Sequence, residues 1–568
     1  MNADFYKSIV KKSPGKFRNL RETIIYDFFQ KSELTQGFPL FFLLFFINLI
    51  LFLAFTLGCN PGNLGVTHDD WLIRRLPAEP DTLNPLTATD IYESIINNDI
   101  YESLLDRDLD TLQLTPELAS TWEVSANGLV YTFKLKDGIK FHDGTPVTAW
   151  NFKYAYARIM DEKVNAPHLR NYYKDIKSVE VLDDKTIRFT YSEIYFRALE
   201  ICGGIPALPK HLFEQHENFN KSPLGRAPVG TGPYKFVQWT TGQKIVLERN
   251  ENYWGEKPHI KKIVYRVITE SAPSLIELKK RRLDLMPLTS LQWVRQTESE
   301  RFHEAFRKEK YYQPNFNYIG WNLRRPYFSD KRVRRALTMM VDRQRILENL
   351  LFNLGIIVTG PNYVNSPYYD ESIKPIPYDP AEAQKLLNEA GWIDHDGDGV
   401  RDKNGVAFKF EFLITGSEFS NQLATLLNEE FHKAGIDMEI RQLEWATFTK
   451  MLDERNFDAV TLGWSLGVET DPYQIWHSSQ IKDGSNFVGF SNPQADKIIE
   501  EVRRTLDVNR RIELLKRFHA ILHEEQPYTF LFCSPSLVAI SKRFGNVIVH
   551  KMGLEPREWT VPAKLTQP

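Results

Sequence analysis

Hydrophobic and polar residues alternate most clearly between Leu129 and Leu135, where leucine, tyrosine and phenylalanine occupy every second position. A period of two is typical of a β-strand with one buried face. Two Asp-Gly pairs follow at 137–138 and 143–144, and such pairs favour turns because Gly and Asp tolerate the required backbone angles. Thr148 then offers a hydroxyl N-cap to residues with helical apolar spacing. This stretch therefore predicts a strand, two turns and a helix.

The same patterns predict further elements on both sides of this stretch. Two alternating runs, 178–181 and 186–191, are joined by an Asp-Asp turn and indicate antiparallel strands. After residue 316 the pattern changes to helices and strands in turn, which indicates an α/β lobe. The expected helices are 331–350, 379–391 (with Asp379 as N-cap and Pro380 at its first position) and 421–434, and the expected strands are 408–413, 438–440 and 457–462.

Length and composition exclude some classes of protein. A chain of 568 residues is too long for one domain and predicts two or three lobes. The net charge of -2 leaves no basic excess to neutralise phosphates, so no nucleic-acid partner is expected. Aromatic residues reach 13%, which fits a large core or a ligand groove lined with rings.

The N-terminal segment has the composition of a targeting signal or membrane anchor. Residues 40–57 form an apolar run broken only by Asn48 and Thr56, after a segment rich in lysine and arginine. A basic lead, an apolar core and a small residue before Cys59 indicate an export signal with lipoprotein processing. The alternative is an uncleaved membrane anchor, because 18 residues at ~1.5 Å per residue span about 27 Å, just enough for a bilayer core. Either way, the chain from about residue 66 is expected outside the cytoplasmic membrane.

The chain has three cysteines. Besides Cys59 there are Cys202 and Cys533, which lie far apart in apolar surroundings. A disulfide between them would need an oxidising compartment, and the alternative is that each is a small buried hydrophobe. The second interpretation is favoured.

Three motifs in order carry a family resemblance. The stretch 127–152 (NGLVYTFKLKDGIKFHDGTPVTAWNF), the loop 228–236 (PVGTGPYKF) and residues 249–255 (RNENYWG) resemble the family 5 extracellular solute-binding proteins, the peptide receptors of ABC importers. The loop 228–236 is rich in glycine, but it leads into a strand and lacks the Lys-Ser/Thr ending of a phosphate cradle, so a turn between lobes is the favoured interpretation. The resemblance covers nearly all of the chain from Trp71 to about Lys551.

The resemblance implies a periplasmic-binding-protein type II-like bilobal α/β fold with an extra small subdomain, mixed sheets and a discontinuous main lobe. The chain is expected to cross between lobes near 312–316 and 530–534. The implied division is an N-terminal signal or anchor and tether at 1–65, a main lobe of 66–110, 225–314 and 533–568, a small subdomain at 111–224, and a second α/β lobe at 315–532.

The resemblance also places the ligand. The family's Gly-Trp pair, whose tryptophan packs on the ligand, corresponds to Gly463-Trp464. Peptide receptors carry an Asp three residues later, which pairs with the peptide's ammonium group, but this chain has Gly467 there. Glu469 or Asp471 are the candidates to replace it, because a buried ammonium without a partner would cost several kcal/mol. The alternative is that both are solvated loop charges.

Three tyrosines complete the candidate ligand site. Tyr318 and Tyr172 match positions where the family has ligand-facing tyrosines, and Tyr473 follows the Trp464 segment. Core packing is an equally good account of Tyr318 and of Tyr172.

Metal and catalytic signals are weaker. Asp394, Asp396, Asp398 and Asp402 have the spacing of a calcium loop, but Gly405 stands where that loop needs a Glu, so a Gly- and Asp-rich hairpin is favoured. Thirteen scattered histidines show no metal spacing. Phe141-His142-Asp143 could suggest a catalytic pair, but no Ser or Cys motif accompanies it and adjacent strand residues point to opposite faces. His142 is therefore expected to be an exposed turn residue.

The expected function is therefore that of an extracytoplasmic receptor and not of an enzyme. It captures short peptides in a cleft between lobes, needs no cofactor, and delivers its ligand to an ABC permease. We expect a monomer, held at the membrane in the periplasm or cell envelope by lipid or an N-terminal anchor. The alternative is a receptor of the same fold for an oligosaccharide or a metal chelate, motivated by Gly467; an enzyme is a third and weaker interpretation.

Overall fold

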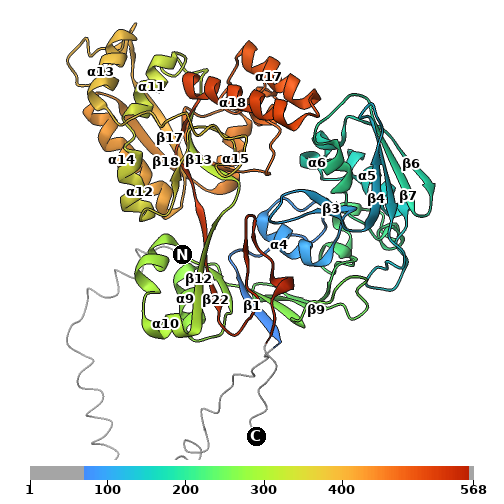
Figure 1. Ribbon diagram of the computed structural model, residues 1–568. Helices are drawn as coiled ribbons and strands as arrows, with labels where there is room; N and C mark the ends of the chain where they lie inside the picture. Colours follow the sequence, from blue (N-terminus) through green and yellow to red (C-terminus); the bar gives the residue numbers. More distant parts are fainter. Residues whose placement is uncertain (1–69, 562–568) are drawn as a thin grey trace, which may run out of the picture. The chain divides into compact units, whose positions relative to one another are not determined.

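Three larger β-sheets organise the described part of the chain, residues 70–561 of the computed structural model (Figure 1). The first has seven strands in the order β12-β22-β11-β1-β10-β9-β8. β1 runs parallel to β10 and β11, and the other pairs are antiparallel, so this sheet is mixed. Its strands are β1 (Trp71–Leu76), β8 (Tyr234–Thr240), β9 (Lys244–Arg249), β10 (Lys262–Val267), β11 (Leu285–Pro287), β12 (Phe306–Tyr312) and β22 (Pro535–Ser541), accompanied by helices α4 (Ile91–Ile100), α9 (Ser271–Lys279) and α10 (Glu300–Ala305).

The second sheet contains the stretch that the alternating pattern singled out. It is antiparallel in the order β4-β5-β7-β6, and Tyr131, Phe133 and Leu135 of β5 are buried. The predicted helix follows Thr148, whose backbone N–H donates to Asn151 Oδ1. The elements are β4 (Ala119–Val124), β5 (Val130–Leu135), β6 (Ile176–Asp183), β7 (Thr186–Tyr191), the hairpin of β2 (Leu105–Arg107) and β3 (Leu114–Pro116), and helices α5 (Ala149–Met160), α6 (Pro167–Tyr173), α7 (Ala198–Gly203) and α8 (Lys210–Phe213).

The third sheet is mixed and has the order β18-β17-β19-β13-β20. Figure 1 shows helices gathered around it, as expected for an α/β lobe. The strands are β13 (Asn315–Trp321), β17 (Lys409–Thr415), β18 (Asp437–Leu443), β19 (Ala459–Ser465) and β20 (Tyr528–Phe530), and the helices are α11 (Lys331–Met339), α12 (Arg343–Leu351), α13 (Pro380–Glu389), α14 (Glu418–Lys433), α15 (Trp445–Asp453), α16 (Tyr473–Trp476), α17 (Pro493–Arg504) and α18 (Val508–Glu525). Short pairs add β14 (Ile356–Ile357) with β21 (Phe532–Cys533), β15 (Asp402–Lys403) with β16 (Val406–Ala407), and β23 (Val549–His550) with β24 (Gly553–Leu554).

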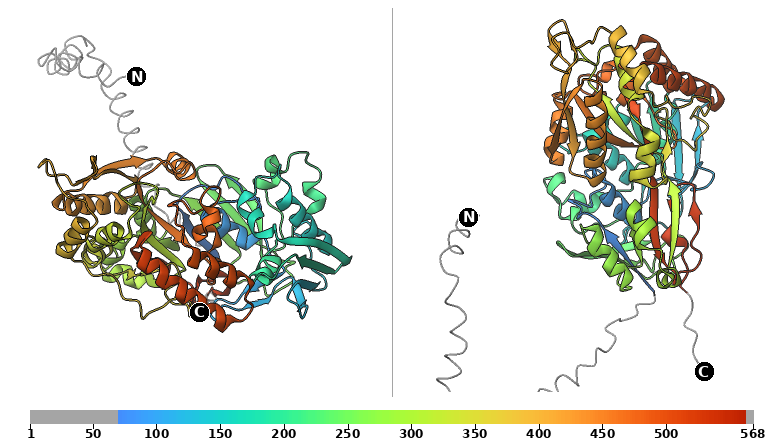
Figure 2. Two further views of the ribbon diagram at one scale, coloured as in Figure 1. Left: turned by 90° about the horizontal axis from the view of Figure 1, so that it is seen from above. Right: turned by 90° about the vertical axis from the view of Figure 1, so that its left-hand side faces the viewer.

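The mixed sheets and the return of the chain to the first sheet at β22 confirm the predicted α/β class with a discontinuous main lobe. The chain passes from β12 to β13 and returns from β20 and β21 to β22, and these connections lie side by side (Figure 2). Asn315 Nδ2 donates to the Ser534 carbonyl at 3.0 Å, and Ser534 N–H donates to Asn315 Oδ1 at 2.9 Å. Two adjacent connections, bonded to each other, therefore join the first sheet to the third.

The single helix predicted over 331–350 is wrong. The structure has two helices, α11 and α12, because Asp342 caps a new helix by accepting the N–H of Arg345 at 2.9 Å. Apolar spacing continues on both sides of the break, so it could not reveal the break. The two cysteines in the described residues, Cys202 and Cys533, are free and buried, which supports the interpretation as small hydrophobes.

His142 is also not the exposed turn residue that we predicted. Its ring lies against the Gly-rich loop, with Nε2 3.0 Å from the Gly232 carbonyl and Nδ1 accepting the Gly230 N–H at 3.3 Å. Burial lowers the pKa of His142 to about 4. The histidine therefore joins the turn 137–147 to the loop that leads into β8.

His519 of α18 is a second histidine that is buried in its neutral form. Its Nδ1 accepts the N–H of Asp370 at 3.3 Å, so Nε2 carries the hydrogen and donates to Thr359 Oγ1 at 2.9 Å. Burial is the main reason that the pKa of His519 is lowered to about 4.

The stability of the protein should therefore fall as the pH is lowered from 6.5 to 4. In this window the unfolded chain binds a proton at position 519 and the folded chain does not. The free energy of unfolding is therefore highest above pH 6.5, and each such histidine lowers it by up to about 3 kcal/mol as the pH falls to 4. From pH 7.5 to 4, the midpoint of thermal unfolding should fall less steeply in His519→Gln than in wild type. His259 is exposed, so His259→Gln should show the same fall in midpoint as wild type. Equal slopes for His519→Gln and wild type would contradict this assignment.

Candidate functional site

The site is built around Trp464, the next-to-last residue of β19. Its half-buried indole is parallel to the ring of Phe487, with centroids 6.1 Å apart and planes 3° from each other. Its Nε1 lies 3.5 Å from the hydroxyl of Tyr528. The indole is thus held on one side by an aromatic ring and on one edge by a hydroxyl, which fixes its orientation before any ligand is present.

A cavity of about 320 Å³, here called the Trp464 cavity, lies beside this indole. One wall comes from the segment after β19 and from α16, and the other comes from α6 and the start of α7. The cavity brings together three of the predicted ligand residues, Tyr172, Trp464 and Asp471. Its lining also includes Gly467 and Arg197, whose guanidinium lies over the Tyr172 ring at 5.7 Å.

The end of β19 has an unpaired edge. On one side β19 pairs along its whole length with β13, from Asn315 opposite Ser465 to Trp321 opposite Ala459. On the other side β17 pairs only with Ala459 and Val460. Among the described residues, no strand covers the second edge of 461–465. This backbone edge, ending at the Trp464 cavity, has the geometry that accepts an added strand.

Asp471 lies on the cavity wall but is already bonded within the protein. The hydroxyl of Tyr195 donates to Asp471 Oδ2 at 3.1 Å, and the Tyr473 N–H donates to Oδ1 at 3.0 Å. Arg503 Nε forms an ion pair with Oδ2 at 3.1 Å, at an angle outside that of a hydrogen bond. The carboxylate is therefore neutralised and oriented by neighbours from two parts of the chain.

Glu469 is placed differently from Asp471. Arg511 Nε donates to Glu469 Oε1 at 2.6 Å, and Arg511 is buried. The residue does not line the Trp464 cavity. Glu469 is thus the counter-ion of a buried arginine of α18.

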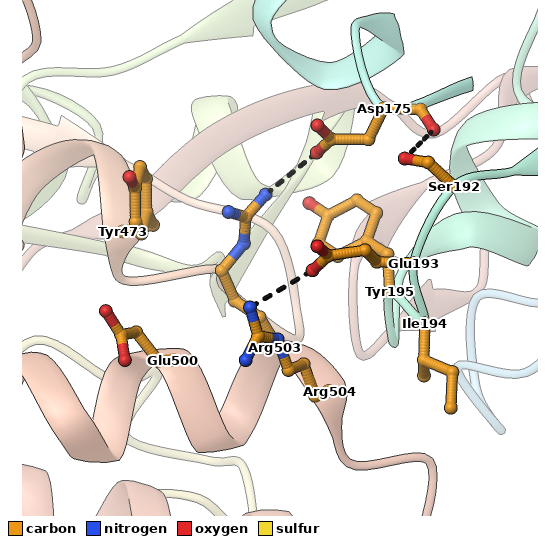
Figure 3. A pocket seen from close by; sticks show the side chains of 9 residues that line it. All are labelled: Asp175, Ser192, Glu193, Ile194, Tyr195, Tyr473, Glu500, Arg503 and Arg504. Carbon is orange, nitrogen blue, oxygen red and sulfur yellow. Dashed lines mark hydrogen bonds and ion pairs between the residues drawn. The ribbon is translucent and has the colours of Figure 1, made fainter. Parts of the chain in front are cut away.

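Arg503, near the end of α17, contacts the segment that leads into β6 of the four-stranded sheet. Figure 3 shows its guanidinium directed at Asp175, and the two groups lie 3.4 Å apart. The rings of Tyr195 and Tyr473 lie 4.9 and 4.5 Å from the guanidinium carbon. Burial alone would lower the pKa of Arg503, but Asp471 and Tyr195 more than offset this and the pKa is raised. These residues, with Asp471, are here called the Arg503 cluster. All of them except Asp471 line a second cavity of about 240 Å³.

Tyr318 and Tyr473 do not line the Trp464 cavity. Tyr318 is buried in β13 and stacks on Tyr528, with centroids 3.8 Å apart, so it supports the floor behind Trp464. Tyr473 lies in the Arg503 cluster, and its hydroxyl is 3.0 Å from Ser479 Oγ. Any contact of either tyrosine with ligand stays a prediction.

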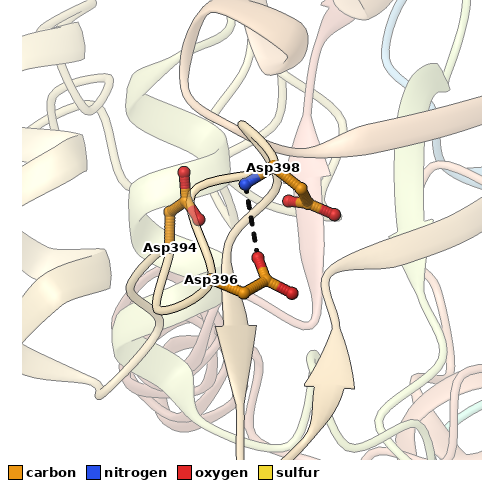
Figure 4. Close-up of side chains that lie close together, drawn as sticks. All are labelled: Asp394, Asp396 and Asp398. Carbon is orange, nitrogen blue, oxygen red and sulfur yellow. Dashed lines mark hydrogen bonds between the residues drawn. The ribbon is translucent and has the colours of Figure 1, made fainter.

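The acidic loop at 394–402 lines neither of these two cavities. Asp394, Asp396 and Asp398 are exposed, and their carboxylates approach within 4.8 Å of one another (Figure 4). The carboxylates accept N–H groups of their own loop, such as Gly397 N–H to Asp394 Oδ1 at 2.7 Å. Asp402 instead accepts the His395 N–H and begins the β15–β16 hairpin. These bonds account for the loop as a turn, and calcium stays the alternative prediction.

Sequence reasoning missed Arg197, Tyr195 and Arg503. No motif contains them, and their partners are distant in sequence: Tyr195 and Asp471 are separated by 276 residues. Only the folded structure identifies such residues, because the sequence does not distinguish an arginine at a ligand site from an arginine on the surface.

Comparisons with known proteins agree with this architecture. The family model described as bacterial extracellular solute-binding proteins, family 5 Middle, matches residues 113–486. The oligopeptide-binding protein AppA of Bacillus subtilis is 31% identical over 492 residues, covering 83% of this chain and 88% of that protein.

Solved structures of the same fold include receptors with different ligands. AppA from Bacillus subtilis in complex with a nonapeptide matches with a TM-score of 0.77 and 28% identity, covering 87% of this chain and 99% of that one. NikZ from Campylobacter jejuni in complex with Ni(L-His) matches with a TM-score of 0.76 and 26% identity, covering 87% and 99%. The fold alone therefore does not decide the ligand.

Proposed function

This chain belongs to the family 5 bacterial extracellular solute-binding proteins, and we propose that it captures short peptides in the Trp464 cavity and delivers them to an ABC permease. The relative from Bacillus subtilis is named an oligopeptide-binding protein, and its solved structure holds a nonapeptide. Receptors of this family bind solutes, so no catalysis is part of the proposal.

The observation that carries the proposal is the unpaired edge of β19 next to Trp464. An extended peptide that adds to this edge is held by main-chain hydrogen bonds, which are the same for every sequence. The indole then supplies apolar contact without selecting one side chain. This combination fits a receptor for peptides of mixed sequence.

The Arg503 cluster suggests how the bound state is held closed. Arg503 reaches Asp175 next to β6 and Asp471 after β19, and the Phe196 N–H donates to the Arg503 carbonyl at 2.9 Å. The paired connections near Asn315 and Ser534 serve as the hinge. Ligand favours closure only as far as it binds the closed form better than the open one.

Thermal unfolding with three classes of ligand tests the proposal. A mixture of tripeptides at 100 times Kd should stabilise the protein by about 2.7 kcal/mol and raise its midpoint, whereas maltotriose should leave it unchanged. Nickel with histidine is the third arm, because a structural neighbour holds that chelate. Stabilisation by the chelate or the sugar, and not by peptides, would assign the alternative ligand.

The acid that receives the peptide's ammonium is the next prediction, and we propose Asp471 because it lines the cavity and Glu469 does not. Asp471→Asn should weaken binding of trialanine by about tenfold more than it weakens binding of N-acetyltrialanine, since a hydrogen bond to a charged group contributes about 1.5 kcal/mol. The change seen with the acetylated peptide measures any effect on the Arg503 cluster. Glu469→Gln should lower stability and leave the ratio of the two affinities at its wild-type value. A ratio that changes only in Glu469→Gln would contradict this choice.

The N-terminal proposals, an export signal and a lipid on Cys59, concern residues outside those the structure describes. No helix within residues 70–561 is long and apolar enough to cross a bilayer. We propose a monomeric receptor in the periplasm or cell envelope, anchored by lipid on Cys59 or by an uncleaved helix at 40–57. Cells fed radioactive palmitate should label the wild-type protein and not Cys59→Ser. A membrane-bound, unlabelled wild-type protein would favour the uncleaved helix.

A further inference from the structure

Arg197, immediately before α7, has a guanidinium that is only partly used within the protein. Its Nε donates to Glu200 Oε2 at 2.8 Å, and the side chain is 16% exposed. Between residues 70 and 561, no hydrogen-bond acceptor is paired with its two terminal nitrogens. Because Arg197 lines the Trp464 cavity, these nitrogens have N–H groups available for a ligand.

The space in front of this guanidinium is kept open by Gly467. A Cβ at residue 467 would lie 4.0 Å from Arg197 Nη2 and 3.7 Å from the Glu469 carbonyl oxygen, which are ordinary contact distances. The backbone of Gly467 does not have a positive φ, so its conformation does not demand glycine. Neither strain nor crowding explains the glycine, and its effect is to leave room between Arg197 and the loop after β19.

Among the described residues, the acid paired with Arg197 is Glu200, and Arg197 has only a share of it. Glu200 is shared by Arg197 and by Arg107, whose Nη2 lies 3.2 Å from Oε1. The acid of the cavity, Asp471, is paired with Arg503. The bond of Arg197 to Glu200 uses its Nε, so its terminal nitrogens remain available to a second anion, and a planar guanidinium end binds a carboxylate through two parallel hydrogen bonds.

We propose that Arg197 and Gly467 form a carboxylate-binding subsite of the Trp464 cavity. This rests on the proposed function and deepens it, because it selects peptides that present a carboxylate near Trp464. The carboxylate is either the α-carboxylate of a short peptide or an acidic side chain, and the two share the same chemistry at Arg197.

Titration calorimetry on the full-length protein distinguishes these sources. Trialanine against its C-terminal amide tests the α-carboxylate, and Ala-Glu-Ala-amide against Ala-Gln-Ala-amide tests the side chain. In at least one pair the acidic peptide should bind roughly 10-fold to 100-fold more tightly to wild type. Arg197→Gln should reduce that ratio to about one, and Gly467→Asp should do the same by supplying a competing carboxylate.

The matched control is Arg107→Gln, which also removes an ion pair of Glu200 but leaves the cavity wall intact. Arg107→Gln should keep the wild-type ratio of the two peptide affinities. Loss of that ratio in Arg197→Gln then cannot result from the loss of an ion pair of Glu200. A ratio near one in wild type for both pairs, or a ratio that survives Arg197→Gln, overturns the subsite.

A second probe separates the subsite from the peptide proposal. Glutarate at millimolar concentration should raise the unfolding temperature of wild type and not of Arg197→Gln. If no peptide binds and glutarate still gives this difference, the subsite stands and the proposed function fails. If peptides bind without preference for acids and glutarate has no effect, the proposed function stands and the subsite fails. Absence of both effects overturns both.

Discussion

Replacing Trp464 by alanine should weaken the binding of short peptides by roughly 30-fold or more. A buried aromatic contact at the centre of a site typically contributes about 2 kcal/mol or more, which corresponds to that factor in Kd. The indole is half-buried and already oriented by Phe487 and Tyr528, so its loss removes ligand contact and little of the core. Titration calorimetry with trialanine measures the effect.

Two variants make that result interpretable. Trp464→Phe keeps an apolar ring and should recover part of the affinity. Trp445→Ala removes a tryptophan that is 56% exposed on α15 and does not line the cavity, and it should bind as wild type does. Wild-type affinity in Trp464→Ala would remove the indole from the ligand site.

Gly230→Ala should destabilise the protein by on the order of 3 kcal/mol, the upper range for overpacking a core. A Cβ at Gly230 would lie 2.0 Å from the carbonyl oxygen of Ile100 and 2.7 Å from its carbonyl carbon. These are backbone atoms at the end of α4, so no side chain can rotate away. The loop carrying Gly230 leads into β8, and His142 is bonded to the same loop. Relief of the clash must therefore shift several elements.

Thermal unfolding compares this variant with Gly467→Ala. The added Cβ at residue 467 would make only ordinary contacts, at 3.7 and 4.0 Å. The unfolding midpoint of Gly467→Ala should therefore equal that of wild type. Equal midpoints for Gly230→Ala and wild type would mean that the loop lies further from α4 than the structure has it.

The local elements could be predicted from sequence because their determinants are local. The period of two in β5 and the helix start at Thr148 each involve residues a few positions apart, and the structure confirms the strand and the helix start. The bond at Thr148 runs from its backbone N–H to Asn151 Oδ1 and not from a helix N–H to its hydroxyl. The break between α11 and α12 was missed, although Asp342 is a good cap, because the apolar pattern continues across it. His142 was misjudged because its partners, Gly230 and Gly232, are about 90 residues away.

The candidate site could be predicted only where a motif carried it. The family resemblance pointed to Trp464, and the structure brings Tyr172 and Asp471 to the same cavity. The partners of the acids were not predictable, since ion pairs such as Arg511 with Glu469 depend on how α18 packs against the loop after β19. Arg197 has no motif at all, and its importance appears only beside Gly467.

Peptide capture is the central claim, and the small molecules released when the purified protein is unfolded test it most directly. The full-length protein, purified from its own cell envelope without refolding, should release short peptides of mixed sequence on acid denaturation, detected by mass spectrometry. Much less peptide should be released from an equal amount of Trp464→Ala. Release of saccharides or of a metal chelate, with no peptide from wild type, would contradict the account.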